Sequence, residues 1–188
     1  MQADPMAEIP RIPFDELPPK LQDELRAKYE RLGYLGEFFQ VGAHQPEALY
    51  HFNRFTETLK EALPPNIVEL LALTLSAWSG NVYERVQHER LALKYDLSRD
   101  WIVAVERLDP ANAAALSPAE KAVQRLALAM AETQGRGAAG ALDACAAFFK
   151  ASELVAILLT VGRYLAHAAL ANTLRFKAPV PSPLEGAP

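Results

Sequence analysis

The segment Pro64–Tyr95, PPNIVELLALTLSAWSGNVYERVQHERLALKY, decides the fold and contains the candidate site. Residues 67–78 carry a single charged side chain, that of Glu69, and are otherwise apolar or small. A helix that is apolar on nearly all sides normally lies at the centre of a bundle or between subunits. Gly80 breaks this helix, and Asn81 can cap the next one, which we expect to reach the end of the segment. The two predicted helices can pack antiparallel across this turn.

Helical patterning extends over most of the chain. Strand-like alternation is absent and β-branched residues are few, which predicts an all-α bundle of about eight helices in a single domain over residues 1–188. The expected helices span roughly residues 18–32, 46–63, 64–79, 81–95, 98–108, 117–132, 142–149 and 152–175. Prolines near both ends predict extended termini at residues 1–13 and 177–188.

Composition narrows the class of protein. The chain has 188 residues, is 51% hydrophobic and carries a formal net charge of −4. A nucleic-acid or anionic-membrane surface usually needs a basic patch, so we expect neither partner. The N-terminal residues lack the pattern of a signal peptide, and the longest uncharged stretch, Leu70–Tyr83, is shorter than a membrane span of roughly 20 residues. We therefore expect a cytoplasmic protein, and the two strongly apolar helices suggest a homo-oligomer.

The chemistry concentrates in the pattern Glu69-x11-Asn81-x2-Glu84-x3-His88. An unpaired carboxylate in an apolar helix face costs several kcal/mol, so Glu69 needs partners. The next helix offers a carboxylate and an imidazole four residues apart, which stacks them one turn above the other. These two share a stripe with Leu91 and Tyr95, and a half-apolar stripe suits the wall of a pocket.

These residue types predict acid–base catalysis. His88 is expected to titrate near neutrality and is the natural general acid or base. Glu69 is placed to hold or relay a proton, and Glu84 to orient His88 or act as a base. The side chains expected to contact substrate are Asn81, Tyr83 and Tyr95, of which Asn81 can donate a hydrogen bond to a developing enolate. A helical Glu–His pair is also common on protein surfaces, which leaves an exposed pair as the alternative.

Other candidates are weaker. Glu69, Glu84 and His88 resemble a carboxylate-rich metal site, but robust helical sites carry more histidine, so we expect no metal and no cofactor. We expect His51 to be exposed or to act as a cap. His167 lies in an apolar helix and is expected to be a buried structural histidine. Whether Arg163 or Arg175 reaches the pocket stays open, and Tyr164 could line it.

The spacing resembles the pattern Glu-x11-Cys-x2-Cys-x3-His of the alkylhydroperoxidase D-like branch of the carboxymuconolactone decarboxylase family. Glu69 and His88 match, whereas Asn81 and Glu84 stand at the two cysteine positions. The resemblance covers roughly Leu17–Phe176, with a core module at about residues 60–110. It implies an all-helical alkylhydroperoxidase D-like fold, a small-molecule substrate, and a homotrimer or hexamer with the active site near a subunit interface.

The missing cysteines decide which branch the chain resembles more. In the redox branch one sulfur attacks peroxide and the other closes a disulfide. The lone cysteine, Cys145, lies elsewhere in the apolar stretch LDACAAFF and is expected to be inert. The resemblance therefore implies an acid–base decarboxylase (lyase) or isomerase acting on a small lactone-like or carboxylated organic acid. The alternatives are a peroxidase that uses Cys145 or an external thiol, and a non-catalytic helical binding protein.

Overall fold

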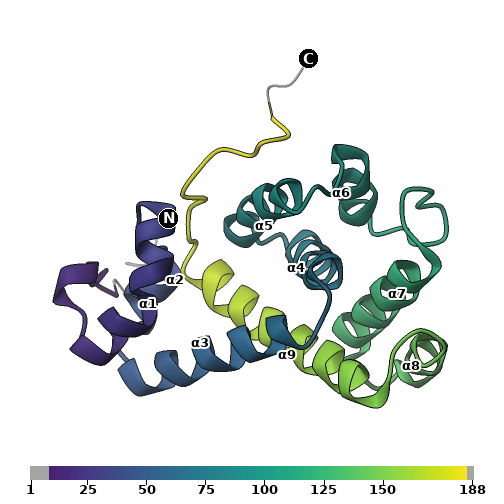
Figure 1. The fold of residues 1–188 in the computed structure, drawn as a ribbon, viewed down its shortest axis with the longest axis horizontal. Coiled ribbons are helices and arrows are strands. Elements are labelled where there is room, and N and C mark those ends of the chain that lie inside the picture. The colour runs from purple at the N-terminus through teal and green to yellow at the C-terminus, as the bar shows by residue number, and fades with distance from the viewer. Residues whose placement is uncertain (1–8, 186–188) are drawn as a thin grey trace, which may run out of the picture. The chain divides into compact units, whose positions relative to one another are not determined.

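Helix α4, Pro65–Ser79, is the central element of the helices that surround the candidate site (Figure 1). The computed structural model describes residues 9–185. Every residue of α4 from Ile67 to Ser76 is buried, because the helix packs against neighbours on several sides. Those neighbours are α5 (Val82–Lys94), α6 (Arg99–Glu106), α7 (Pro118–Thr133) and α9 (Ala151–Thr173). The predicted all-α fold, with this apolar segment at its centre, is confirmed.

The chain divides into two compact units, Met1–Phe55 and Thr56–Pro188, and the boundary falls within helix α3, Pro46–Glu61. The first unit contains a 3-10 turn at Phe14–Glu16, helix α1 (Pro19–Leu32), helix α2 (Glu37–Gly42) and the start of α3. The second contains the end of α3 and the helices from α4 onward. All the predicted site residues lie in the second unit, and the single domain over residues 1–188 stays a prediction.

The ends of the helices follow from local hydrogen bonding. Gly80 takes a left-handed conformation with φ of 67° and ends α4. The side chain of Asn81 then accepts a hydrogen bond from the backbone N–H of Glu84 at 3.2 Å, which caps the start of α5. At α7, Ser117 and Glu120 form the predicted capping box. The turn between α4 and α5 is therefore fixed by side chains next to the candidate site.

Two short helices differ from the sequence prediction. Nine α-helices occur among the described residues, and the unpredicted one is α2, which buries Phe38 and Val41. Helix α8 spans Ala139–Cys145 rather than residues 142–149. A helix of six or seven residues gives too little periodicity to recognise, and the glycines around both helices suggested loops instead.

The segment that follows α9, over residues 174–185, contains no helix or strand. It lies along α5 and α6, where Arg99 donates to the carbonyl of Pro183 at 2.8 Å and the hydroxyl of Ser182 donates to the carboxylate of Glu89. Residues 9–13 have no helix either. The remaining parts of the predicted extended termini, residues 1–8 and 186–188, lie outside the described residues.

Helix α9 is the one helix of the described residues that is long and apolar enough to cross a membrane. The core helix of a soluble protein passes the same test, and 44% of the relevant window of α9 is buried inside the structure. The length of uncharged stretches does not single out α9, because Glu153 and Arg163 interrupt them.

Candidate active site

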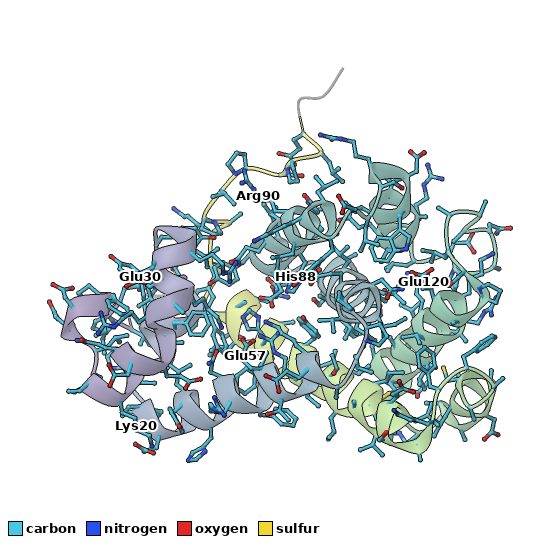
Figure 2. All side chains as sticks on the ribbon, in the orientation of Figure 1. Lys20, Glu30, Glu57, His88, Arg90 and Glu120 are labelled. Atoms are coloured by element: carbon cyan, nitrogen blue, oxygen red, sulfur yellow. The ribbon has the colours of Figure 1, made fainter. Side chains whose placement is uncertain are left out.

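Glu69 and His88 meet in the interior of the second unit. Nδ1 of His88, on α5, lies 2.7 Å from Oε2 of Glu69, on α4, and the two residues are 6% and 3% exposed. The antiparallel arrangement of α4 and α5 brings them together across 19 residues of sequence. In Figure 2 the side chain of His88 lies among those of the surrounding helices. The predicted partner of the buried carboxylate is therefore present.

Glu84 contacts three other side chains of the site. Its Oε1 lies 3.3 Å from Nε2 of His88 and accepts a hydrogen bond from Nη1 of Arg163 at 3.0 Å. Its Oε2 lies 2.9 Å from Nε2 of His167. Arg163 and His167 both come from α9, so this single carboxylate joins α5 to α9.

Burial and charge set the protonation states. Burial alone would raise the pKa of Glu84, but His167, Arg163 and the histidine hydrogen bonds hold it well below its usual value. Burial would lower the pKa of His88, but the charges of Glu69 and Glu84 and their hydrogen bonds raise it to about 9. At neutral pH, His88 is therefore an imidazolium that can donate from both ring nitrogens. The expected titration near neutrality is corrected, because two carboxylates flank the ring.

The second histidine behaves differently. Burial lowers the pKa of His167, which outweighs the opposing effect of Glu84. A neutral ring with its proton on Nε2 donates to the carboxylate of Glu84, and Tyr83 stacks on this ring at a centroid distance of 5.9 Å. His167 therefore serves to hold Glu84 in place.

Tyr164 approaches the other side of His88. Its hydroxyl lies 3.4 Å from Nε2 of His88, and the rings meet edge to face at 5.5 Å. The guanidinium of Arg163 lies over the tyrosine ring at 4.3 Å. Burial raises the pKa of Tyr164 well above 10, so the phenol keeps its proton.

A small depression reaches the site beside Tyr164. It has a volume of about 10 Å³, room for roughly one water molecule. Its lining consists of Thr56, Leu59, Lys60, Val68, Thr160, Arg163 and Tyr164. An organic substrate therefore needs Lys60 or another rim side chain to move aside before it can enter.

Of the three residues predicted to contact substrate, two are buried and one is exposed. Asn81 is 2% exposed, and its side-chain oxygen caps α5. Tyr83 is 3% exposed and contacts His167 and Phe176. Tyr95 is 50% exposed at the end of α5, away from the buried cluster. The substrate-binding roles of these three residues stay predictions.

Helix α9 supplies three side chains of the site that were not predicted as catalytic. Of these, the positions of Arg163 and Tyr164 were left undecided by the sequence, and His167 was expected to be structural. Arg163 reaches Glu84, whereas Arg175 is exposed beyond the end of α9. The available signal was an arginine, a tyrosine and a histidine within five residues of an otherwise apolar helix. Arg163 and His167 are four residues apart, so they share one face.

The structure also shows the surroundings of His51 and Cys145. His51 is exposed and lies 3.9 Å from the carboxylate of Glu47. Cys145 is fully buried on α8, and burial raises the pKa of its thiol to about 11. Within residues 9–185, no group of three or more His, Cys, Asp or Glu side chains is arranged to hold a metal ion.

Comparisons with known proteins identify a family match for part of the chain and several structures of the same fold. Residues 46–129 match the carboxymuconolactone decarboxylase family. An uncharacterized peroxidase-related protein from Ralstonia eutropha JMP134, described as an alkylhydroperoxidase AhpD core, is 18% identical, with a TM-score of 0.79 over 94% of each chain. A variant of the debrominase Bmp8 in complex with 2,3,4-tribromopyrrole is 15% identical, with a TM-score of 0.72 over 85% of each chain.

A third similar structure is a protein of unknown function from Agrobacterium tumefaciens. It is 20% identical, with a TM-score of 0.66, and the match covers 74% of this chain and 96% of that one. At such identities these likenesses show the alkylhydroperoxidase D-like fold alone. No curated protein matches the sequence.

Proposed function

We propose that the chain is an acid–base enzyme, because residues 46–129 match the carboxymuconolactone decarboxylase family. The reaction is of the decarboxylase (lyase) or isomerase type, on a small lactone-like or carboxylated organic acid. One observation carries the proposal: the buried ring of His88 lies between the carboxylates of Glu69 and Glu84, with Nδ1 and Nε2 at 2.7 and 3.3 Å from their oxygens. These carboxylates raise the pKa of His88 to about 9, which supplies a proton for transfer at neutral pH.

The chemistry suits a decarboxylation. Loss of carbon dioxide from a lactone carboxylate breaks a carbon–carbon bond and leaves an electron pair that must accept a proton. The His88 imidazolium is the source of that proton, and Glu69 stabilises its charge. Arg163 lies at the wall of the depression and offers positive charge to a substrate carboxylate. Glu84 already accepts hydrogen bonds from three side chains, so its role is to hold them in position.

The comparisons support a small cyclic substrate. The family takes its name from the decarboxylation of a lactone, and one protein of the same fold, Bmp8, binds the ring compound 2,3,4-tribromopyrrole. The volume of the depression in this structure is much smaller than either kind of molecule, so binding requires rim side chains to move.

The peroxidase alternative is disfavoured by the thiol. A peroxidatic cysteine must be an accessible thiolate, whereas Cys145 is 0% exposed and its pKa is raised to about 11. Peroxide consumption that disappears in Cys145→Ser would favour this alternative over acid–base catalysis.

The test is turnover of carboxymuconolactone and related lactone carboxylates, followed by the loss of ultraviolet absorbance and by carbon dioxide release. We expect His88→Gln to lower kcat at least 100-fold, because glutamine keeps polarity but cannot act as the acid. His51→Gln is the matched control, since His51 is exposed in the first unit, and its rate should equal the wild-type rate. Near-normal turnover in folded His88→Gln protein contradicts the proposal.

If no lactone is turned over, thermal-shift measurements on wild type and His88→Gln test the alternative of a non-catalytic binding protein. A compound that stabilises both proteins equally would favour a non-catalytic binding protein. Stabilisation of the wild type alone would place the ligand at His88 and direct the search to other reactions of that ligand.

A further inference from the structure

We propose that Tyr164 donates the proton to the substrate and that His88 donates a proton to Tyr164 in the same step. This inference rests on the proposed acid–base function and identifies the group that touches the substrate. His88, the proton source, is buried and separated from the entrance, so a connecting group is needed.

The position of Tyr164 provides this connection. Its side chain belongs to the wall of the depression, together with Arg163 and Thr160, whereas Glu69, Glu84 and His88 do not form part of that wall. Its hydroxyl lies 3.4 Å from Nε2 of His88. A molecule that enters through the depression therefore meets Tyr164 before it can approach His88. Catalytic hydrogen bonds are often this long in unliganded proteins and shorten when the substrate binds.

The alternative donors fit less well. Glu84 is a carboxylate that already accepts hydrogen bonds, and it carries no proton at neutral pH because its pKa lies well below the usual value. A guanidinium group does not give up its proton in proteins, so Arg163 can bind an anion but cannot serve as the acid. Lys60 stands at the rim and pairs with Glu57 at 3.3 Å, with its side chain 36% exposed. Tyr164 belongs to the wall, and its hydroxyl also lies 3.4 Å from Nε2 of His88.

Two protons move in this relay. The phenol proton of Tyr164 passes to the substrate carbon as the carbon–carboxylate bond breaks and carbon dioxide leaves. The Nε2 proton of His88 passes to the phenol oxygen, which leaves His88 neutral with its Nδ1 proton directed at Glu69. Solvent later returns one proton to His88, so the atoms and charges balance.

The two transfers belong to one step. Burial raises the pKa of Tyr164 well above 10, so a free phenolate at this position is unfavourable. The oxygen can release its proton only as His88 supplies another. The Arg163 guanidinium, 4.3 Å from the ring, favours the negative charge that builds up briefly on the phenol.

The first test is Tyr164→Phe, which retains the ring and its packing. We expect kcat to fall at least 100-fold while KM changes by less than about threefold, because the hydroxyl acts in the proton transfer. Tyr50→Phe is the matched control: it removes a phenol hydroxyl from α3 in the first unit, outside the candidate site. Its kcat should change by less than about threefold.

A second measurement uses the wild-type protein alone and does not depend on how a variant folds. The rate is recorded in mixtures of H2O and D2O. Two protons moving in one step give a bowed dependence on the deuterium fraction, whereas a direct transfer from His88 gives a straight line. A straight line, or a Tyr164→Phe rate close to wild type, overturns the relay.

The outcomes separate this inference from the proposed function. Loss of activity in His88→Gln combined with normal activity in Tyr164→Phe removes the relay and leaves acid–base catalysis standing. Normal activity in His88→Gln removes both. Loss in both variants with a bowed deuterium dependence supports the relay.

Discussion

At the scale of single residues, the site is a group of charged side chains around the imidazole ring of His88. Glu69 and Glu84 flank His88, and Arg163 balances the second carboxylate. Removing one member of such a buried pair leaves the other charge without compensation, which costs several kcal/mol. The charges are thus interdependent, and their protonation depends on the folded structure.

This dependence makes stability sensitive to pH. The folded-state pKa of His88 is raised from 6.5 to about 9, so its contribution is fully present below pH 6.5 and is lost as the pH rises through 9. We expect the free energy of unfolding to fall across this window by at most about 3 kcal/mol. Urea unfolding at a series of pH values from 6 to 10 measures it, with His88→Gln as the comparison. Equal slopes for both proteins would contradict the predicted pKa of His88.

At the scale of helices, α5 and α6 share a second pair of carboxylates outside the candidate site. Arg85 on α5 lies 3.5 Å from Glu89 on the same helix and 4.0 Å from Glu106 on α6. Ser182, from the C-terminal segment, donates to Glu89. Burial, followed by the charge of Glu89, raises the pKa of Glu106 to about 7.

The sign of this shift predicts the effect of a substitution. A carboxyl whose folded pKa is raised contributes stability below its ordinary pKa of 4.5, and that contribution is lost as the pH rises through 7. We expect Glu106→Gln to remain neutral and therefore to be more stable relative to wild type at pH 8 than at pH 5. Thermal unfolding at the two pH values measures the difference. A difference of the opposite sign would contradict the assignment.

The helices also show what the sequence could and could not predict. Glu69, Glu84 and His88 were predicted because adjacent helices joined by a short turn have few ways to pack. Arg163, Tyr164 and His167 lie about 80 residues later, and their place depends on how α9 packs on α4, which local periodicity does not specify. Helices α2 and α8 were missed or shifted because each is shorter than two full turns. The fold class could be predicted from helical periodicity alone. The three site residues on α9 could be placed only with the tertiary structure.

At the scale of the whole molecule, the outer face of α9 bears on the expected homo-oligomer. Seven of its exposed positions recur at alternating spacings of three and four residues, which is the pattern of a helix-pairing seam. They are Ser152, Val155, Leu159, Gly162, Ala166, Ala169 and Thr173. Large residues precede Gly162 and small ones follow it, so two antiparallel copies of α9 would set Leu159 against Ala166. The seam carries no charge, and Val155 and Leu159 are 54% and 45% exposed.

We therefore expect a homo-oligomer that depends on this face. Light scattering after gel filtration should give a multiple of the 20.7 kDa chain mass for the wild type. Leu159→Glu should shift the mass toward that of one chain, because it buries a charge in the seam. Val103→Glu, on α6, is the control at another exposed apolar residue and should leave the mass unchanged. A monomeric wild type would contradict the expectation.

The cap at the start of α5 has a consequence for protein engineering. Asn81 and Glu84 stand at the two cysteine positions of the pattern that the sequence resembles, and the side chain of Asn81 accepts a hydrogen bond from the backbone N–H of Glu84 at 3.2 Å. Asn81→Cys would remove the cap, and Glu84→Cys would leave Arg163 and His167 without their shared carboxylate. Each single substitution toward a cysteine pair is therefore expected to lower the stability of the fold. An engineer who wants thiol chemistry at these positions would need compensating changes at the start of α5 and on α9.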